Sequence, residues 1–186
     1  MLYDRFGLPI YFRLPDPFTP PELRQALVLA GYEEFDPTFV MGRAIDNVEP
    51  FPTEIELHEM DPVDWLELRA WMTGTPLVRL GHHAAVLRVI LPEKVLLGLM
   101  VGGQPVACGM GVVEGKLLGY FSIYTRRSAR RCGYGKAMMS ALSEWGKANG
   151  ADYGYLQVEG HNAPALAMYE RLGFERLYRY LYCKKV

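Results

Sequence analysis

The sequence predicts an α+β fold in which a central mixed sheet is flanked by helices. Three apolar segments separated by glycine-containing turns, Lys94–Val101, Val106–Val113 and Leu117–Thr125, predict an antiparallel meander. Amphipathic helices and strands then alternate towards the C-terminus. With 186 residues, 50% of them hydrophobic, the chain is long enough for one well-buried core.

Residues 1–50 are expected to form a short strand-helix-strand extension ahead of a main domain at residues 51–186. The stretch 47–53 contains two prolines and no hydrophobic period, which marks the boundary. The elements expected in the extension are a strand at 10–13, a helix that begins at Thr19-Pro20-Pro21-Glu22 with Thr19 as its cap and ends at Gly31, and a strand at 38–41.

The main domain adds elements on both sides of the meander. Before it we expect a strand at 55–58, a helix that opens at Asp61-Pro62, and a second helical stretch at 84–90. The elements expected after it are a helix from Gly135 to Asn149, a strand at 153–158, a helix from Asn162 to Leu172 that Gly173 ends, and a strand at 176–183.

Charge and cysteine content exclude several classes of protein. The 20 Lys and Arg residues against 21 Asp and Glu residues leave a formal charge of −1, so no overall field attracts nucleic acid or an acidic membrane. The three cysteines, Cys108, Cys132 and Cys183, have neither metal-ligand spacing nor the even number of a disulfide framework. Since no secretory signal and no run of roughly 20 apolar residues is found, we expect a cytoplasmic protein without a metal site.

A glycine-rich turn follows the meander and opens the next helix. Gly133 and Gly135 let backbone N–H groups come close to an anion, and the helix N-terminus adds about half a positive charge at the same place. The cations around these glycines are Arg126, Arg127, Arg130, Arg131 and Lys136. The turn is therefore suited to hold a pyrophosphate.

Two other phosphate-binding patterns do not fit this turn. The loop of nucleoside-triphosphate-binding proteins needs a glycine where Arg130 stands, and a Ser or Thr for magnesium where Ala137 stands. The dinucleotide-binding fingerprint needs a third glycine at the position of Met138. What remains is the pattern Arg-x-x-Gly-x-Gly, placed after a strand and at the start of a helix.

This pattern resembles the cofactor motif of the GNAT superfamily of N-acyltransferases. The segment Leu156–Phe174 resembles the second hallmark of that family: a strand, then Asn162, an Ala three residues later, and Tyr-x-x-x-Gly-Phe from Tyr169. The two matches are separated by one helix and one strand, as in the family. The resemblance covers residues 54–186, and it implies the GNAT fold and an acetyl-CoA-dependent N-acetyltransferase.

The resemblance also implies roles for particular residues. Backbone groups of Ile123, Tyr124 and Thr125 would pair with the pantetheine arm of acetyl-CoA like an extra strand. The loop that would hold the pyrophosphate comprises Arg130, Arg131, Cys132, Gly133, Tyr134, Gly135 and Lys136. Asn162 would contact the cofactor near its pantetheine end, and it is also a good helix N-cap in its own right.

Tyr169 is the expected general acid because of its position in the second motif. A phenol of pKa about 10 can donate a proton to a leaving thiolate whose thiol has a pKa of about 8.5. The alternative is that Tyr169 is simply a core residue, since it shares a helical face with Met168 and Leu172. The oxyanion is expected to accept a backbone N–H from residues 123–125, where the sheet must splay to admit the thioester.

The general base, the acceptor and the N-terminal extension are less determined by the sequence. Glu159, His161, Ser122 and Glu114 are candidates for the base, and a water chain is the alternative that the family often uses. The acceptor is expected to be a primary amine of a small molecule or a peptide. Residues 1–50 resemble the end of a half-domain that precedes some GNAT domains. The hypothesis is that they lie beside the acceptor cleft or at a homodimer contact, and that the chain is a shortened version of such a protein.

Two rival functions are weighed against this enzyme. A non-catalytic GNAT-like sensor would bind acyl-CoA without turnover, but the intact Tyr169 favours catalysis. A nucleic-acid-binding module is disfavoured because Arg126–Arg131 is only a local basic patch in a chain of balanced charge.

Overall fold

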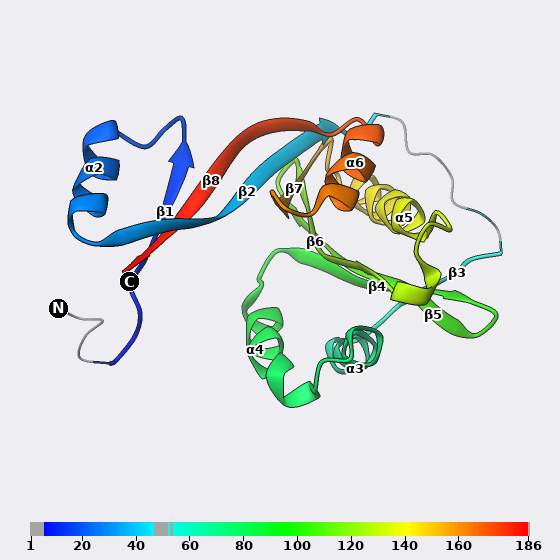
Figure 1. Ribbon diagram of the computed structural model, residues 1–186. Helices are drawn as coiled ribbons and strands as arrows, with labels where there is room; N and C mark the ends of the chain where they lie inside the picture. The colour runs from blue at the N-terminus through cyan, green and yellow to red at the C-terminus, as the bar shows by residue number, and fades with distance from the viewer. Residues whose placement is uncertain (1–5, 47–51, 53, 186) are drawn as a thin grey trace. The chain divides into compact units, whose positions relative to one another are not determined.

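The computed structural model describes residues 6–46, 52 and 54–185. The helices and strands follow the order that the sequence predicts, most of them with bounds that differ by a few residues (Figure 1). The predicted boundary at 47–53 falls almost wholly outside the described residues.

The chain forms two compact units. The smaller combines Met1–Gly42 with Gln157–Val186, and the larger is Arg43–Leu156. The C-terminal segment belongs with the N-terminal one because its last strand pairs with the first two strands of the chain. The division into domains at 1–50 and 51–186 stays a prediction.

The larger unit is built on a mixed sheet whose strands lie in the order β7-β6-β5-β4-β3. Their bounds are Tyr153–Glu159 for β7, Leu117–Thr125 for β6, Gln104–Glu114 for β5, Glu93–Val101 for β4 and Glu56–Glu59 for β3. Neighbours from β3 to β6 are antiparallel, which confirms the predicted meander. β7 runs parallel to β6, from the pair Leu117–Tyr153 to the pair Tyr120–Leu156.

Helices cover both faces of this sheet (Figure 1). α3 (Pro62–Thr73) and α4 (Gly81–Val89) lie on one face, joined by a short 3-10 turn at Leu77–Leu80, and α5 (Tyr134–Ala148) lies on the other. Asp61 caps α3 as predicted, because its Oδ1 accepts two backbone N–H groups of the first turn at 2.7 and 3.1 Å.

Glycines set how closely α5 approaches the sheet. A Cβ atom added at Gly109 of β5 would lie 3.0 Å from Met138 Cγ of α5, and one added at Gly146 of α5 would lie 2.6 Å from Leu118 Cδ2 of β6. The first contact is tighter than most and the second is too short for a real side chain, so the glycines let helix and strands come close together. Leu142, 0% exposed, packs into the same interface. α5 is therefore packed closely against the sheet from Met138 to Gly146.

The face beneath α3 and α4 has its own hydrophobic core. Trp65 of α3 is buried, and its indole Nε1 donates to the Leu97 carbonyl at 3.2 Å. Leu87 of α4 and Met110 and Cys108 of β5 belong to the same cluster. Burial of the indole with its polar atom paired fixes α3 against β4.

The smaller unit joins the two ends of the chain. Its elements in chain order are β1 (Tyr11–Asp16), α2 (Pro21–Leu29), β2 (Tyr32–Ala44), α6 (Ala163–Arg171) and β8 (Glu175–Lys185). β8 is antiparallel to both β1 and β2. β2 is longer than the strand predicted at 38–41, because its pairing with β8 already begins at Tyr32.

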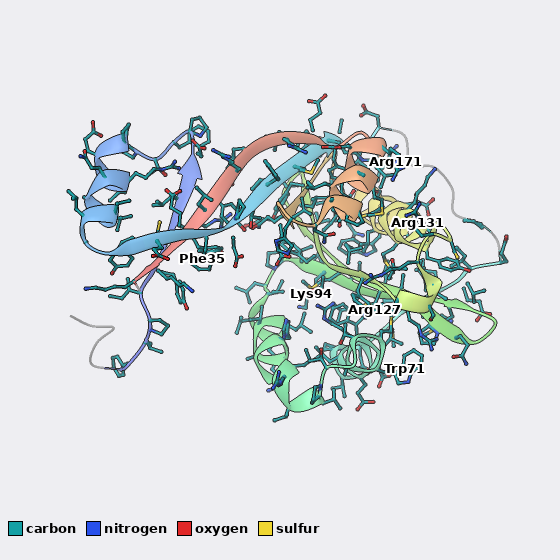
Figure 2. The ribbon with its side chains drawn as sticks, in the orientation of Figure 1. Phe35, Trp71, Lys94, Arg127, Arg131 and Arg171 are labelled. Carbon is teal, nitrogen blue, oxygen red and sulfur yellow. The ribbon has the colours of Figure 1, made fainter. Side chains whose placement is uncertain are left out.

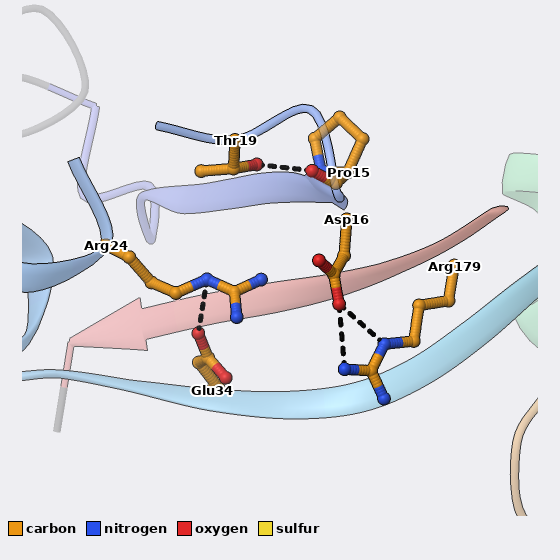
Figure 3. Close-up of polar contacts among 6 residues, drawn as sticks. All are labelled: Pro15, Asp16, Thr19, Arg24, Glu34 and Arg179. Carbon is orange, nitrogen blue, oxygen red and sulfur yellow. Dashed lines mark hydrogen bonds and ion pairs between the residues drawn. The ribbon is translucent and has the colours of Figure 1, made fainter. Parts of the chain in front are cut away.

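Ion pairs link the elements of this unit (Figure 3). On β8, the Arg179 guanidinium contacts Asp16 Oδ2 through Nη2 at 2.7 Å and Nε at 2.8 Å. Arg24 of α2 lies 3.3 Å from Glu34 Oε1 of β2. These contacts tie β1 to β8 and α2 to β2.

The prediction that Thr19 caps α2 is wrong. Its hydroxyl donates to the Pro15 carbonyl at 2.6 Å, and its backbone N–H donates to the same oxygen at 2.7 Å (Figure 3). Pro20 is the N-cap residue, and no described side chain caps this helix. The Thr19 hydroxyl is therefore used by the turn that follows β1, and it does not accept an N–H group of α2.

Candidate functional site

The loop between β6 and α5 presents backbone N–H groups at a helix N-terminus. Gly133 is the N-cap residue and has a φ of 85°, which glycine adopts without strain. No side chain among the described residues caps the helix, and Ala137 N–H bonds the Gly133 carbonyl at 3.0 Å. N–H groups of the first turn precede that bond and point out of the helix, where its dipole favours an anion.

Arginines gather at this end of α5. Arg127 and Arg131 are exposed on the segment that leads into the helix (Figure 2). Arg130 is exposed as well, and its Nε donates to the last carbonyl of β6 at 3.4 Å. Arg126 differs, because its guanidinium lies 4.4 Å from the Trp71 ring in a cation–π contact. The other arginines concentrate positive charge beside the helix N-terminus.

A β-bulge interrupts β6 just before the loop. Ser122 has a φ of 53°, and the register with β5 shifts between Phe121 and Tyr124. Arg69 of α3 donates Nη1 to the Ser122 carbonyl at 3.2 Å. A residue other than glycine keeps a positive φ only where its surroundings hold it there. The bulge re-aims the backbone at the start of the 123–125 stretch.

The second motif lies on α6 of the smaller unit. Asn162 is the N-cap of this helix, and its Oδ1 accepts the Ala165 N–H at 3.3 Å, which confirms the capping role. Tyr169 is 7% exposed, with its ring centroid 5.9 Å from that of Phe174. Burial raises the pKa of Tyr169 to about 12, so the phenol keeps its proton at neutral pH.

A pocket opens on the α4 side of the larger unit's sheet. It has a volume of about 230 Å³, and its walls come from the α4 segment, β5, β6 and β7. Ile90, Met110 and Phe121 make apolar parts of the wall, whereas Glu114 brings a charge. Phe121 directly precedes Ser122, so the pocket and the bulge share one strand.

Comparison with known proteins settles the family. Residues 52–174 match the Acetyltransferase (GNAT) family. The chain belongs to this family. The predicted GNAT fold is thereby confirmed, and the protein is an acetyltransferase. Members of the GNAT family use acetyl-CoA and act on amine acceptors.

Individual relatives agree with this assignment. The chain is 27% identical over 191 residues to the uncharacterized N-acetyltransferase YobR of Bacillus subtilis (strain 168), covering 98% of this chain and 75% of that protein. A GCN5-related N-acetyltransferase from Kribbella flavida has a similar structure, with a TM-score of 0.74, 16% identity, and coverage of 99% of this chain and 71% of that one. AAC(6')-Iy, solved in complex with the bisubstrate analogue CoA-S-monomethyl-acetylneamine, has a TM-score of 0.54 and 18% identity over 67% of this chain and 92% of that one.

The GNAT motif residues divide between the two units. Ile123–Thr125 follow the bulge and Arg130–Lys136 run into α5, so both sets lie on one continuous segment of the larger unit. Asn162 and Tyr169 lie on the smaller unit. Their contacts with a cofactor stay predictions.

Sequence reasoning missed the bulge and its support. Serine has no preference for a positive φ, so no local signal marks Ser122. Arg69 reaches it across 53 residues of sequence, a contact that helical periodicity does not reveal. A signal did exist for the close approach of α5, because Gly109 and Gly111 interrupt an otherwise apolar strand.

The candidates for the general base differ in their surroundings. Glu159 and His161 are neighbours on the surface of the smaller unit, 3.2 Å apart and each more than half exposed. Glu114 lines the pocket. Within the described part of the chain, no group of three or more His, Cys, Asp or Glu side chains is arranged to hold a metal, and no helix is long and apolar enough to cross a membrane.

Proposed function

We propose that this GNAT chain transfers an acetyl group from acetyl-CoA to a primary amine of a small molecule or peptide, by direct attack in a ternary complex. The observation that carries the proposal is the arginine-rich N-terminus of α5, which follows the bulge of β6 on the same segment. The helix N-terminus with its arginines offers the positive charge that a pyrophosphate requires. The bulge opens the strand backbone to a thioester lying beside it.

The loop fits a pyrophosphate in charge and in donors. Backbone N–H groups at the start of α5 and the exposed Arg130 and Arg131 offer hydrogen bonds that anionic oxygens strengthen. When bound, acetyl-CoA supplies an activated acetyl group. We expect the backbone of 123–125 to pair with its pantetheine arm, and Asn162 to contact it near the end of that arm.

Direct attack is favoured over an acylated cysteine. Burial raises the pKa of Cys108 to about 11, against a smaller lowering by nearby Arg69. At pH 7 roughly one molecule in 10⁴ then carries the thiolate that a nucleophile requires. Cys132 lies within the proposed pyrophosphate loop, and Cys183 is buried on β8. The acceptor amine is therefore the nucleophile.

Tyr169 is proposed to assist the leaving group. As the amine nitrogen forms the C–N bond it gives up a proton to a base or to water; the C–S bond breaks, the sulfur takes the electron pair, and the thiolate is protonated in turn by water or by Tyr169. A phenol with a pKa of about 12 is always available as a donor, yet it is a weaker acid than a thiol. The hydroxyl therefore stabilises the departing sulfur mainly through a hydrogen bond.

Calorimetry with acetyl-CoA tests the cofactor site. The double variant Arg130→Ala/Arg131→Ala should bind acetyl-CoA about tenfold or more weakly than the wild type. The wild-type affinity should fall as salt is added, and that of the variant should fall less, because the variant lacks the ionic contacts. Arg79→Ala is the matched control, since Arg79 is exposed on the 3-10 turn before α4. If the wild-type protein does not bind acetyl-CoA, the proposal fails.

A thiol-release screen over amines tests turnover and the role of Tyr169. Tyr169→Phe should lower kcat about 10- to 100-fold while leaving acetyl-CoA affinity unchanged. Because the pKa of Tyr169 lies near 12, the wild-type kcat should not fall between pH 8 and pH 10. Binding without turnover on any amine, unaltered in Tyr169→Phe, would instead support the sensor.

A further inference from the structure

The pocket of the larger unit has a composition that selects among amines. Ile90, Met110, Val112, Phe121 and Tyr155 give it an apolar wall, and Glu114 is the charged residue that lines it. Met110, Val112 and Glu114 alternate along β5, so their side chains project from the same face of the sheet. That face is the one that α3 and α4 cover.

A glycine under the pocket allows two rings to pack there. A Cβ atom added at Gly119 would lie 2.4 Å from Phe121 Cε2 and 3.0 Å from Tyr155 Oη. The two rings meet edge to face, with centroids 6.1 Å apart and planes at 88°. The absence of a side chain at Gly119 lets both rings lie low on the sheet, and this gives the pocket an aromatic floor.

The pocket runs from the bulge to a charged rim. Phe121 pairs with Met110 and adjoins Ser122, so one end of the pocket lies where the proposed reaction occurs. Glu114 lies four residues further along β5, roughly 13 Å away at the usual rise of a strand, and it is exposed. An acceptor bound here would therefore have its middle against apolar side chains and its far end beside a carboxylate.

We propose that the acceptor is a primary amine on an apolar aliphatic or aromatic body without an anionic group. This inference rests on the proposed function, because it assigns the acceptor of that reaction. The volume of about 230 Å³ has room for roughly eight heavy atoms if each occupies the ~30 Å³ of a water molecule. The carboxylate of Glu114 attracts cationic acceptors and repels those with a carboxylate at the far end.

Linear amines from ethylamine to decylamine test the apolar wall. Affinity by calorimetry, and kcat/KM by thiol release, should rise about three- to fourfold for each methylene and level off near eight carbons. 2-Phenylethylamine should match the longer alkylamines, and glucosamine should be poor. An affinity that does not depend on chain length overturns the proposal.

Two variants with a matched control locate the effect in the pocket. Val112→Phe adds four heavy atoms to the wall, so the plateau should move to amines about four carbons shorter. Val78→Phe makes the same change at a side chain that is 86% exposed and outside the pocket, and it should keep the wild-type profile. Wild-type protein should bind 6-aminohexanoate more weakly than hexylamine, and in Glu114→Gln the ratio of the two affinities should shrink about threefold.

The two readouts separate this inference from the proposed function. Chain-length-dependent binding without thiol release would support the pocket assignment and contradict the transferase. Thiol release that prefers glucosamine over octylamine would support the transferase and overturn the pocket assignment. Acetyl-CoA affinity, measured on each variant, shows that the larger unit is still folded.

Discussion

The two faces of the larger unit's sheet are packed in opposite ways. On the α5 face, Gly109, Gly111 and Gly146 remove side chains so that the helix lies directly on the strands, and Leu142 is fully buried. On the other face, α3 and Leu87 of α4 pack on a hydrophobic core, but a pocket lined by Val86 and Ile90 lies beside that core, and Val86 and Val89 of α4 are exposed. The α5 face, called the closed face below, is filled by the helix, whereas the α4 face carries a pocket beside its core and is called the open face.

The difference corresponds to two tasks. A cofactor shared by a whole family can be held by backbone groups at a fixed helix end, which close packing of α5 provides. An acceptor that varies between members needs a wall of replaceable side chains, and the proposed acceptor pocket has such a wall, with side chains from the α4 segment and from β5, β6 and β7. The following predictions test whether the two faces are as different as this comparison claims.

The largest expected contrast is in cysteine labelling. Cys108 is 0% exposed beneath the α4 face with a pKa near 11, whereas Cys132 is exposed in the loop before α5. At pH 7.5 roughly one Cys108 in 3,000 is a thiolate, and burial also excludes the reagent from Cys108, so iodoacetamide should modify the exposed Cys132 at least about 10³-fold faster. Peptide mass spectrometry measures both rates, with Cys132→Ser as the control. Acetyl-CoA should protect Cys132, and labelling that ignores it would contradict the placement of the cofactor.

Leu142 under α5 should contribute far more to stability than Leu117 beside the pocket. Leu142→Ala leaves a cavity under α5 and should cost about 3 kcal/mol of unfolding free energy, a factor of over 100 in the equilibrium. Leu117→Ala removes the same atoms from the open face, where the side chain is 47% exposed, and should cost under about 1 kcal/mol. Urea denaturation compares the two. Equal losses would show that the faces are packed alike.

Arg69 is expected to act as a positioning residue through the bulge. Arg69→Met should lower kcat about tenfold because the Ser122 carbonyl loses its donor and the bulge relaxes. KM for acetyl-CoA should rise by less than kcat falls, since the pyrophosphate contacts proposed for the α5 loop do not involve Arg69. Arg69→Lys should recover part of kcat. A rise in KM with kcat unchanged would point to a structural role alone.

The smallest effect concerns alkaline pH. Tyr120 on the α5 face shares a hydrogen bond of 2.7 Å with Ser143, and burial raises its pKa. A folded-state pKa above the unfolded value means that this stabilisation is complete below about pH 10 and is lost as pH rises further. Tyr120→Phe should cost about 1 kcal/mol at pH 7 and show a shallower loss of stability between pH 9 and pH 11. Thermal unfolding across that range measures it, and parallel curves would contradict the assignment.

Local patterns in the sequence predicted most of the elements, and pairing over long distances produced the differences. Glycines and prolines bounded the helices, and the meander followed from its apolar segments. The pairing of β8 with both β1 and β2 was not predicted, because strand alternation does not name a partner. Thr19 failed as a cap for a similar reason, since the Pro15 carbonyl was the stronger competitor.

The site was only partly accessible from the sequence. The Arg130–Lys136 loop and Asn162 follow from short motifs, in which few residues at fixed spacing determine the chemistry. The pocket brings Ile90, Met110 and Tyr155 together from separate elements, and the spacing of these residues in the sequence does not predict that they meet. Side-chain packing across the sheet determines the wall of the proposed acceptor pocket, so the residues of that wall became visible only in three dimensions.

β1 cannot pair with β8 until the ribosome has synthesised β8. Tyr11 pairs with Lys184, 173 positions later, which at ~5–20 residues per second is a delay of roughly 10 to 35 seconds. During that interval the first strands exist without the neighbour that covers their edges. Nascent chains of this protein therefore expose strand edges until β8 has been synthesised, and in that interval they are candidates for protection by chaperones.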